Sequence, residues 1–152
     1  MHKLINTFFS SGRGVPPPGL PPGGQQAPAD AWALRKLLVV DDERDLADMA
    51  EVLLHGSGLE VKVAYSGLEA LLILENDPEI DALFSDIMMP GMTGLQLANA
   101  VSALYPRVRI VLTSGFTPPS LMSTRQRPYH YLPKPYSMDM VLKLLRSGPK
   151  RP

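Results

Sequence analysis

Three consecutive acidic residues follow an apolar run in the first third of the chain. Residues 38–40 are Leu-Val-Val, and they lead directly into Asp41, Asp42 and Glu43. Carboxylates so close together repel one another, and each makes ionisation of the others more costly unless a cation lies among them. Carboxylate oxygens are the ligands that Mg²⁺ takes in proteins. These residues are therefore either ordinary surface charges at a turn or one side of a cation site.

Three more polar side chains each follow an apolar run: Asp86, Ser114 and Lys134. Each one alone is typical of a turn residue or a solvated charge. As a set they have the parts of a phosphoryl-transfer site. A carboxylate beside Mg²⁺ can act as a nucleophile toward phosphorus, and an ammonium and a hydroxyl can neutralise the oxygens of the transferred group. This chemistry requires that the fold bring the groups to one place.

Strands and helices alternate along the sequence from about residue 36. Runs rich in β-branched residues and leucine predict strands at 36–40, 60–64, 82–85, 109–113 and 129–132. Apolar residues at helical spacing predict helices at 44–56, 67–76, 94–104 and 118–126, and a last helix after Ser137. The apolar stripe of the first helix consists of Leu46, Met49, Ala50, Leu53 and Leu54.

This alternation predicts the α/β class, with a parallel sheet that has helices on both faces. We expect a flavodoxin-like, doubly wound (βα)5 fold with a five-stranded parallel sheet in the order 2-1-3-4-5. The carboxyl ends of the strands then meet at one edge, where such sheets bind ligands. Asp41, Asp42, Asp86, Ser114 and Lys134 are accordingly expected to surround one crevice.

The 152 residues are expected to form one folded domain with flexible ends. Residues 1–33 are rich in Pro and Gly and predict a flexible tail, or alternatively a ligand for a partner groove. Residues 34–148 hold the predicted domain, and residues 149–152 form a short C-terminal tail. The 15 basic residues equal the 15 acidic ones, so neither nucleic acid nor a membrane is expected as a partner. With no cysteine and no membrane-length apolar run, we expect a cytoplasmic protein.

Four segments, LLVVDDE, FSDIMMPGMTG, VLTSGF and YLPKPYS, occur in that order over residues 36–147. In combination they resemble the receiver domain of two-component response regulators. The resemblance implies that Asp86 is the phosphoacceptor, which receives its phosphoryl group from a histidine kinase or a histidine phosphotransfer protein. It also implies that Asp41, Asp42, Asp86 and the backbone carbonyl of Met88 bind Mg²⁺, with Asp42 rather than Asp41 as the direct ligand.

The same resemblance assigns the remaining site residues. Ser114 is implied to be the switch hydroxyl, with Thr113 as the alternative, and Tyr131 the aromatic residue coupled to it. Lys134 is implied to bind a phosphoryl oxygen, and the Lys134–Pro135 peptide bond is expected to be cis. The Met88 side chain cannot orient water, so we expect slow self-dephosphorylation.

Taken together, the sequence predicts a phosphoacceptor without an attached output domain, which signals through a downstream protein target or passes its phosphoryl group onward. A receiver-like interaction module that is never phosphorylated is one alternative. A Mg²⁺-dependent phosphohydrolase that turns over on Asp86 is another, although Met88 stands where such an enzyme needs a second acid. The chain also resembles the C-terminal receivers of hybrid histidine kinases, with the Pro/Gly-rich segment as a linker.

Overall fold

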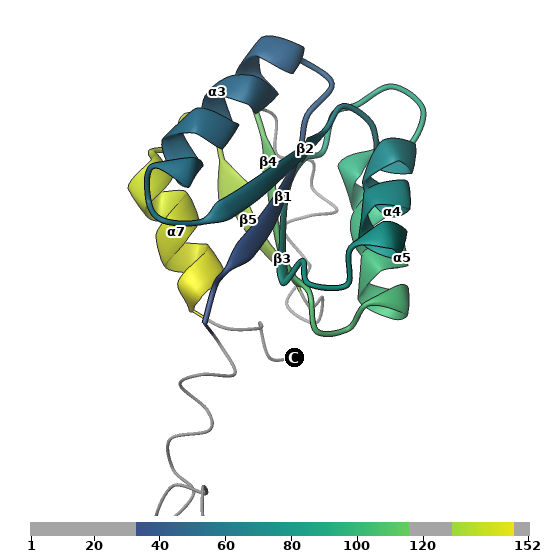
Figure 1. The fold of residues 1–152 in the computed structure, drawn as a ribbon. Coiled ribbons are helices and arrows are strands. Elements are labelled where there is room, and N and C mark those ends of the chain that lie inside the picture. Colours follow the sequence, from purple (N-terminus) through teal and green to yellow (C-terminus); the bar gives the residue numbers. More distant parts are fainter. Residues whose placement is uncertain (1–32, 116–128, 148–152) are drawn as a thin grey trace, which may run out of the picture. The chain divides into compact units, whose positions relative to one another are not determined.

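The computed structural model describes residues 33–115 and 129–147 (Figure 1). The predicted helix at 118–126 and the predicted tails, except for Ala33, lie outside the described residues. Within them, a helix follows each of the first three strands and the last strand, and none of these helices combines the length and apolarity that a membrane span requires.

The sheet has five parallel strands in the order β2-β1-β3-β4-β5, which confirms the predicted fold class. The strands are β1 (Lys36–Val40), β2 (Glu60–Ala64), β3 (Ala82–Asp86), β4 (Arg109–Ser114) and β5 (Tyr129–Pro133). Strands β3, β4 and β5 each extend one residue beyond the predicted end. Asp86 and Ser114 therefore belong to the sheet ladder itself, where backbone hydrogen bonds fix the direction of their side chains.

Helices cover both faces of the sheet (Figure 1). They are α3 (Arg44–His55), α4 (Gly67–Asn76), α5 (Gly94–Leu104) and α7 (Met138–Arg146). Figure 1 shows α3 and α7 on one face and α4 and α5 on the other. Each face has its own apolar cluster, one around Phe84, Val111 and Leu132 and the other around Leu83, Leu112 and Leu97. Alternate residues of the central strands feed the two clusters, because side chains alternate across a strand.

The apolar stripe predicted for the first helix is only partly correct. Ala50 and Leu54 are buried, as is Ala47. The other predicted members, Leu46, Met49 and Leu53, are exposed to 41%, 57% and 50%. The helix rests on the line through its two alanines, because small side chains let the backbone approach the sheet closely, and the larger residues are turned toward solvent.

Side-chain caps start three of the helices at the predicted residues. Ser66, Thr93 and Ser137 each accept a hydrogen bond from a backbone N–H in the first turn, and Thr93 with Gln96 forms a reciprocal capping box. Helix α3 differs, because its N-cap residue Glu43 makes no side-chain cap. The acidic segment therefore passes directly into α3.

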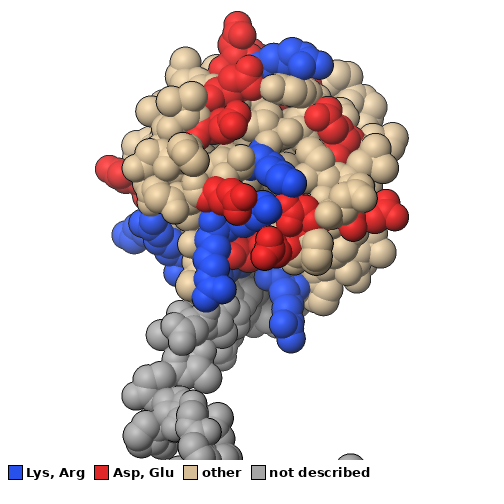
Figure 2. Space-filling view, in the orientation of Figure 1, with Lys and Arg blue, Asp and Glu red and all other residues tan. Residues whose placement is uncertain are grey.

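An ion-pair cluster lies at the amino edge of the sheet, away from the predicted site. The Asp77 carboxylate oxygen Oδ2 lies 2.5 Å from Lys36 Nζ and 2.8 Å from Lys62 Nζ. Hydrogen bonds from Lys36 first, and then Lys62, lower the pKa of Asp77 to about 2. Acidic and basic side chains are interspersed on the face drawn in Figure 2, in keeping with the zero net charge.

Candidate metal centre at the carboxyl edge of the sheet

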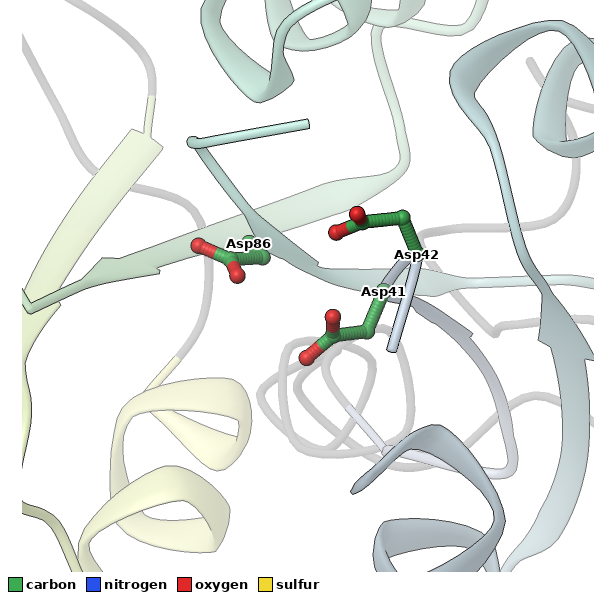
Figure 3. Close-up of side chains that lie close together, drawn as sticks. All are labelled: Asp41, Asp42 and Asp86. Carbon is green, nitrogen blue, oxygen red and sulfur yellow. The ribbon is translucent and has the colours of Figure 1, made fainter. Parts of the chain in front are cut away.

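Three carboxylates gather where β1 and β3 end (Figure 3). Asp41 and Asp42 follow β1 directly, and Asp86 is the last residue of β3. One carboxylate oxygen from each lies within 4.8 Å of the others. The strands are neighbours, and Val40 is level with Ser85, so the next residue on each strand, Asp41 and Asp86, is brought to the same level. This all-oxygen set, with two of its members buried, suits a hard cation such as Mg²⁺.

Backbone hydrogen bonds hold two of these carboxylates in place. Asp41 Oδ1 accepts a bond of 3.0 Å from the Glu43 N–H, and Asp86 Oδ1 accepts one of 3.3 Å from the Met88 N–H. Burial raises the pKa of Asp41 above its ordinary value, and the charges of Asp86 and Asp42 raise it further, against the opposing effect of the Glu43 bond. Negative charge at this site is therefore unfavourable by itself, and a bound cation would stabilise it.

Lys134 approaches the acids from the other side. Its ammonium Nζ lies 3.4 Å from Asp86 Oδ2. Burial alone would lower the pKa of Lys134, but the charge and hydrogen bond of Asp86 outweigh it and raise the pKa above its usual value. The Lys134–Pro135 peptide bond is cis, as expected. The lysine remains a cation at neutral pH and points at a carboxylate oxygen.

Ser114 and Tyr131 lie together on the opposite face of the sheet from Asp86. Leu112, two residues before Ser114, belongs to the apolar cluster under α4 and α5, and Tyr131 packs against the same cluster. The Tyr131 hydroxyl donates a 3.3 Å bond to the Ser114 carbonyl, which also accepts a 3.0 Å bond from the Lys134 N–H. The predicted switch pair is thus adjacent, and one carbonyl links it to Lys134.

Met88 occupies the loop after β3, with its side chain 60% exposed. Its backbone N–H holds Asp86, as described above, which keeps this residue beside the carboxylate cluster. The predicted role of its carbonyl as a metal ligand stays a prediction, as do the individual chemical roles of the other site residues.

Two residues at the site were missed in the sequence. Gly94 begins α5 so close to β3 that a Cβ atom there would lie 2.1 Å from the Asp86 carbonyl oxygen. Tyr136 is half-buried, with its ring edge-on to Phe84 at 5.5 Å, and burial first and then nearby Asp41 and Asp86 raise its pKa despite the charge of Lys134. The signal for Gly94 was a glycine just after an N-cap, and the signal for Tyr136 was its place two residues after Lys134.

Comparison with known proteins agrees with this geometry. Residues 37–146 match the family model described as the response regulator receiver domain. Similar solved structures include the chemotaxis protein CheY4 of Vibrio cholerae, with 30% identity over 75% of this chain and 98% of that chain and a TM-score of 0.67. The receiver domain of the hybrid histidine kinase CckA has 32% identity over 71% of this chain and 93% of that chain, with a TM-score of 0.58.

A third similar structure is the response regulator protein TrrA of Thermotoga maritima, solved in complex with Mg²⁺ and BeF. It has 27% identity over 72% of this chain and 94% of that chain, with a TM-score of 0.63. The family match covers most of the chain and all of the parallel sheet except Lys36, the first residue of β1. The chain belongs to the response regulator receiver domain family of two-component signalling.

Proposed function

We propose that this receiver domain accepts a phosphoryl group on Asp86, in a Mg²⁺-dependent reaction with a phosphohistidine donor. The observation that carries the proposal is the setting of Asp86. Its carboxylate is grouped with those of Asp41 and Asp42 within 4.8 Å, and it lies 3.4 Å from the Lys134 ammonium. A nucleophilic oxygen with acids for a cation on one side and an ammonium on the other is suited to phosphoryl transfer.

In the proposed reaction, an Asp86 carboxylate oxygen forms a bond to phosphorus while the bond between phosphorus and the donor imidazole nitrogen breaks. The electron pair of that bond stays on the imidazole, and an acyl phosphate forms on Asp86. Asp41, Asp42, Asp86 and the Met88 carbonyl would hold Mg²⁺, which neutralises charge on the phosphoryl oxygens when bound. The TrrA complex with Mg²⁺ and BeF supports this assignment by analogy.

Lys134 and Ser114 would act on the new phosphoryl group from the protein side. The Lys134 ammonium, already directed at Asp86 Oδ2, moves to a phosphoryl oxygen and stabilises charge there. Ser114 turns its hydroxyl toward the phosphoryl group, and Tyr131 follows because both lie on the same face of the sheet. The change in these side chains biases the surface that a partner reads.

The proposed partners are a histidine kinase or a histidine phosphotransfer protein as donor and a downstream protein as target, in the cytoplasm. The match to the receiver of a hybrid histidine kinase supports a position in a phosphorelay within this proposal. We also propose that the domain catalyses only its own phosphorylation and dephosphorylation. The exposed thioether of Met88 offers no acid or base for rapid hydrolysis, so we expect a long-lived acyl phosphate.

The test is intact mass after incubation of the full chain with Mg²⁺ and acetyl phosphate. We expect one added phosphoryl group in the wild type and in Asp48→Asn, a control outside the acid cluster, and none in Asp86→Asn or after chelation of Mg²⁺. Absence of any gain in the wild type, with acetyl phosphate and with a phosphohistidine donor, would contradict the proposal and favour an unphosphorylated interaction module. Release of many equivalents of phosphate from a small ester would favour the phosphohydrolase.

A further inference from the structure

Thr113 presents a buried hydroxyl inside the site that none of the proposed steps uses. The residue is 2% exposed, and its Oγ1 atom has no hydrogen-bond partner among the described residues. A buried hydroxyl without a partner destabilises the fold, and an apolar residue of the same shape would avoid that cost. The position of Thr113 in the sheet indicates what its hydroxyl can do.

The sheet ladder places Thr113 beside Asp86. Thr113 is level with Asp86 on β3 and with Leu132 on β5. Two residues earlier on each strand, Val111 and Phe84 both belong to the apolar cluster under α3 and α7. Because side chains alternate along a strand, Thr113 and Asp86 face this same side of the sheet.

The ion pair between Lys134 and Asp86 joins residues on the two sides of β4. Lys134 follows β5, and Asp86 ends β3, with the end of β4 between them. The lysine ammonium nevertheless reaches Asp86 Oδ2 at 3.4 Å, and Asp86 is level with Thr113 on β4. The Thr113 hydroxyl is therefore a buried polar group on the strand between the two members of this ion pair, level with Asp86.

The ion pair leaves Lys134 with donors to spare. A charge-assisted N–H···O bond is about 2.7–2.9 Å long, so the 3.4 Å separation from Asp86 is a loose one. An ammonium has three donors, and a threonine oxygen can accept one of them. We infer that Thr113 is a positioning residue of the phosphorylation site, whose hydroxyl accepts a hydrogen bond from the Lys134 ammonium as that ammonium moves from the Asp86 carboxylate to the phosphoryl group.

This role is distinct from that of Ser114, which lies one residue further along β4 and faces the opposite side of the sheet with Tyr131. Thr113 acts through Lys134 and does not touch the reacting atoms. The inference rests on the proposed function of Asp86, since the lysine has nothing to move to without a phosphoryl group.

The test compares rates of phosphorylation of the full chain by acetyl phosphate and Mg²⁺. Thr113→Val removes the hydroxyl and keeps the shape, and we expect it to slow the reaction about tenfold, as loss of one hydrogen bond to a charged group would. Thr113→Ser keeps the hydroxyl and is expected to react at nearly the wild-type rate. Thr113→Ala is the second hydroxyl-free variant and gives the same comparison if the valine variant unfolds.

A double-mutant cycle separates positioning from general destabilisation. In a Lys134→Ala background, Thr113→Val is expected to cause no further loss of rate, because the hydroxyl acts through the missing ammonium. Equal rates for the wild type and both hydroxyl-free variants would overturn the inference while the proposed function stands. The same tenfold loss in the Lys134→Ala background would also overturn it. A wild type that takes up no phosphoryl group would overturn both.

Discussion

The Lys134 ammonium lies 3.4 Å from Oδ2 of Asp86, although 48 positions separate the two residues along the chain. The contact exists because the sheet order places β5 next to β4 and β4 next to β3. Asp41 and Asp42 approach the same carboxylate from β1. The Asp86 carboxylate thus lies between the Lys134 ammonium and two further carboxylates that are suited to bind a metal cation. The proposed chemistry depends on this arrangement.

Removal of the lysine charge should slow phosphorylation. Lys134→Ala leaves developing phosphoryl charge without its ammonium, and we expect the rate with acetyl phosphate to fall about a hundredfold, the lower end of the loss for a preorganised donor. Lys134→Arg keeps the charge with a different shape and should lose less. The rate is measured by intact mass against time. An alanine variant as fast as the wild type would show that the ammonium is not used.

The acid cluster should lower the stability of the metal-free protein and provide its affinity for Mg²⁺. Asp41→Asn removes a buried charge whose pKa is raised, so we expect the metal-free protein to gain about 0.5–2 kcal/mol of unfolding free energy. Mg²⁺ affinity should fall at least about tenfold. Thermal melts with and without Mg²⁺ measure both effects.

The control for this variant is Asp45→Asn, in the first turn of α3. The Asp45 charge interacts favourably with the dipole of α3, so its loss should lower the free energy of unfolding by less than about 1 kcal/mol. Mg²⁺ affinity should remain nearly unchanged. A metal-free Asp41→Asn that is less stable than the wild type would contradict the account of the cluster.

Gly94 should tolerate no side chain. A Cβ atom would lie 2.1 Å from the Asp86 carbonyl oxygen, which cannot move without shifting the proposed phosphoacceptor. Gly94→Ala is expected to lower the free energy of unfolding by about 1–3 kcal/mol, as overpacking of a core does. This loss is expected although alanine ordinarily favours a helix more than glycine does. Gly56→Ala is the control, because its nearest neighbour would be 3.5 Å away. Equal unfolding free energies for the two variants in urea would contradict the steric argument.

The Asp77 cluster should set part of the acid stability. A depressed carboxyl pKa stabilises the fold above the ordinary pKa of 3.8, and the contribution is lost as the pH falls toward about 2. We expect Asp77→Asn to lower the free energy of unfolding by about 2 kcal/mol at pH 7. The difference in unfolding free energy between this variant and the wild type should shrink between pH 4 and pH 2. Glu79→Gln, whose side chain is 82% exposed, should cost under about 0.5 kcal/mol. A difference that is constant with pH would rule out the ion pair as the cause.

The sequence predicted the sheet well because a buried parallel strand is a short apolar run with clear ends. Helices α4, α5 and α7 begin where predicted, since Ser66, Thr93 and Ser137 are strong N-cap residues. Helix α3 also begins where predicted, directly after the acidic segment. Four polar residues predicted at strand ends, Asp41, Asp42, Asp86 and Lys134, lie together because parallel strands end at one edge.

Other features depend on packing that periodicity does not encode. The stripe of α3 was too wide, because apolar spacing does not tell which of two adjacent lines, Ala47–Ala50 or Leu46–Met49, rests on the sheet. The close approach of Gly94 to β3 and the edge-on contact of Tyr136 with Phe84 are long-range events between segments that are distant in sequence. The position of Thr113 level with Asp86 required the strand register.

The most direct test of the central claim locates the phosphoryl group. The full chain is phosphorylated with acetyl phosphate and Mg²⁺ and reduced with borohydride, which converts an aspartyl phosphate to homoserine, and its peptides are sequenced by mass spectrometry. Our account predicts homoserine at position 86 and aspartate at positions 41 and 42. Homoserine at another aspartate, or a phosphoryl group stable to borohydride on a histidine or serine, would contradict it.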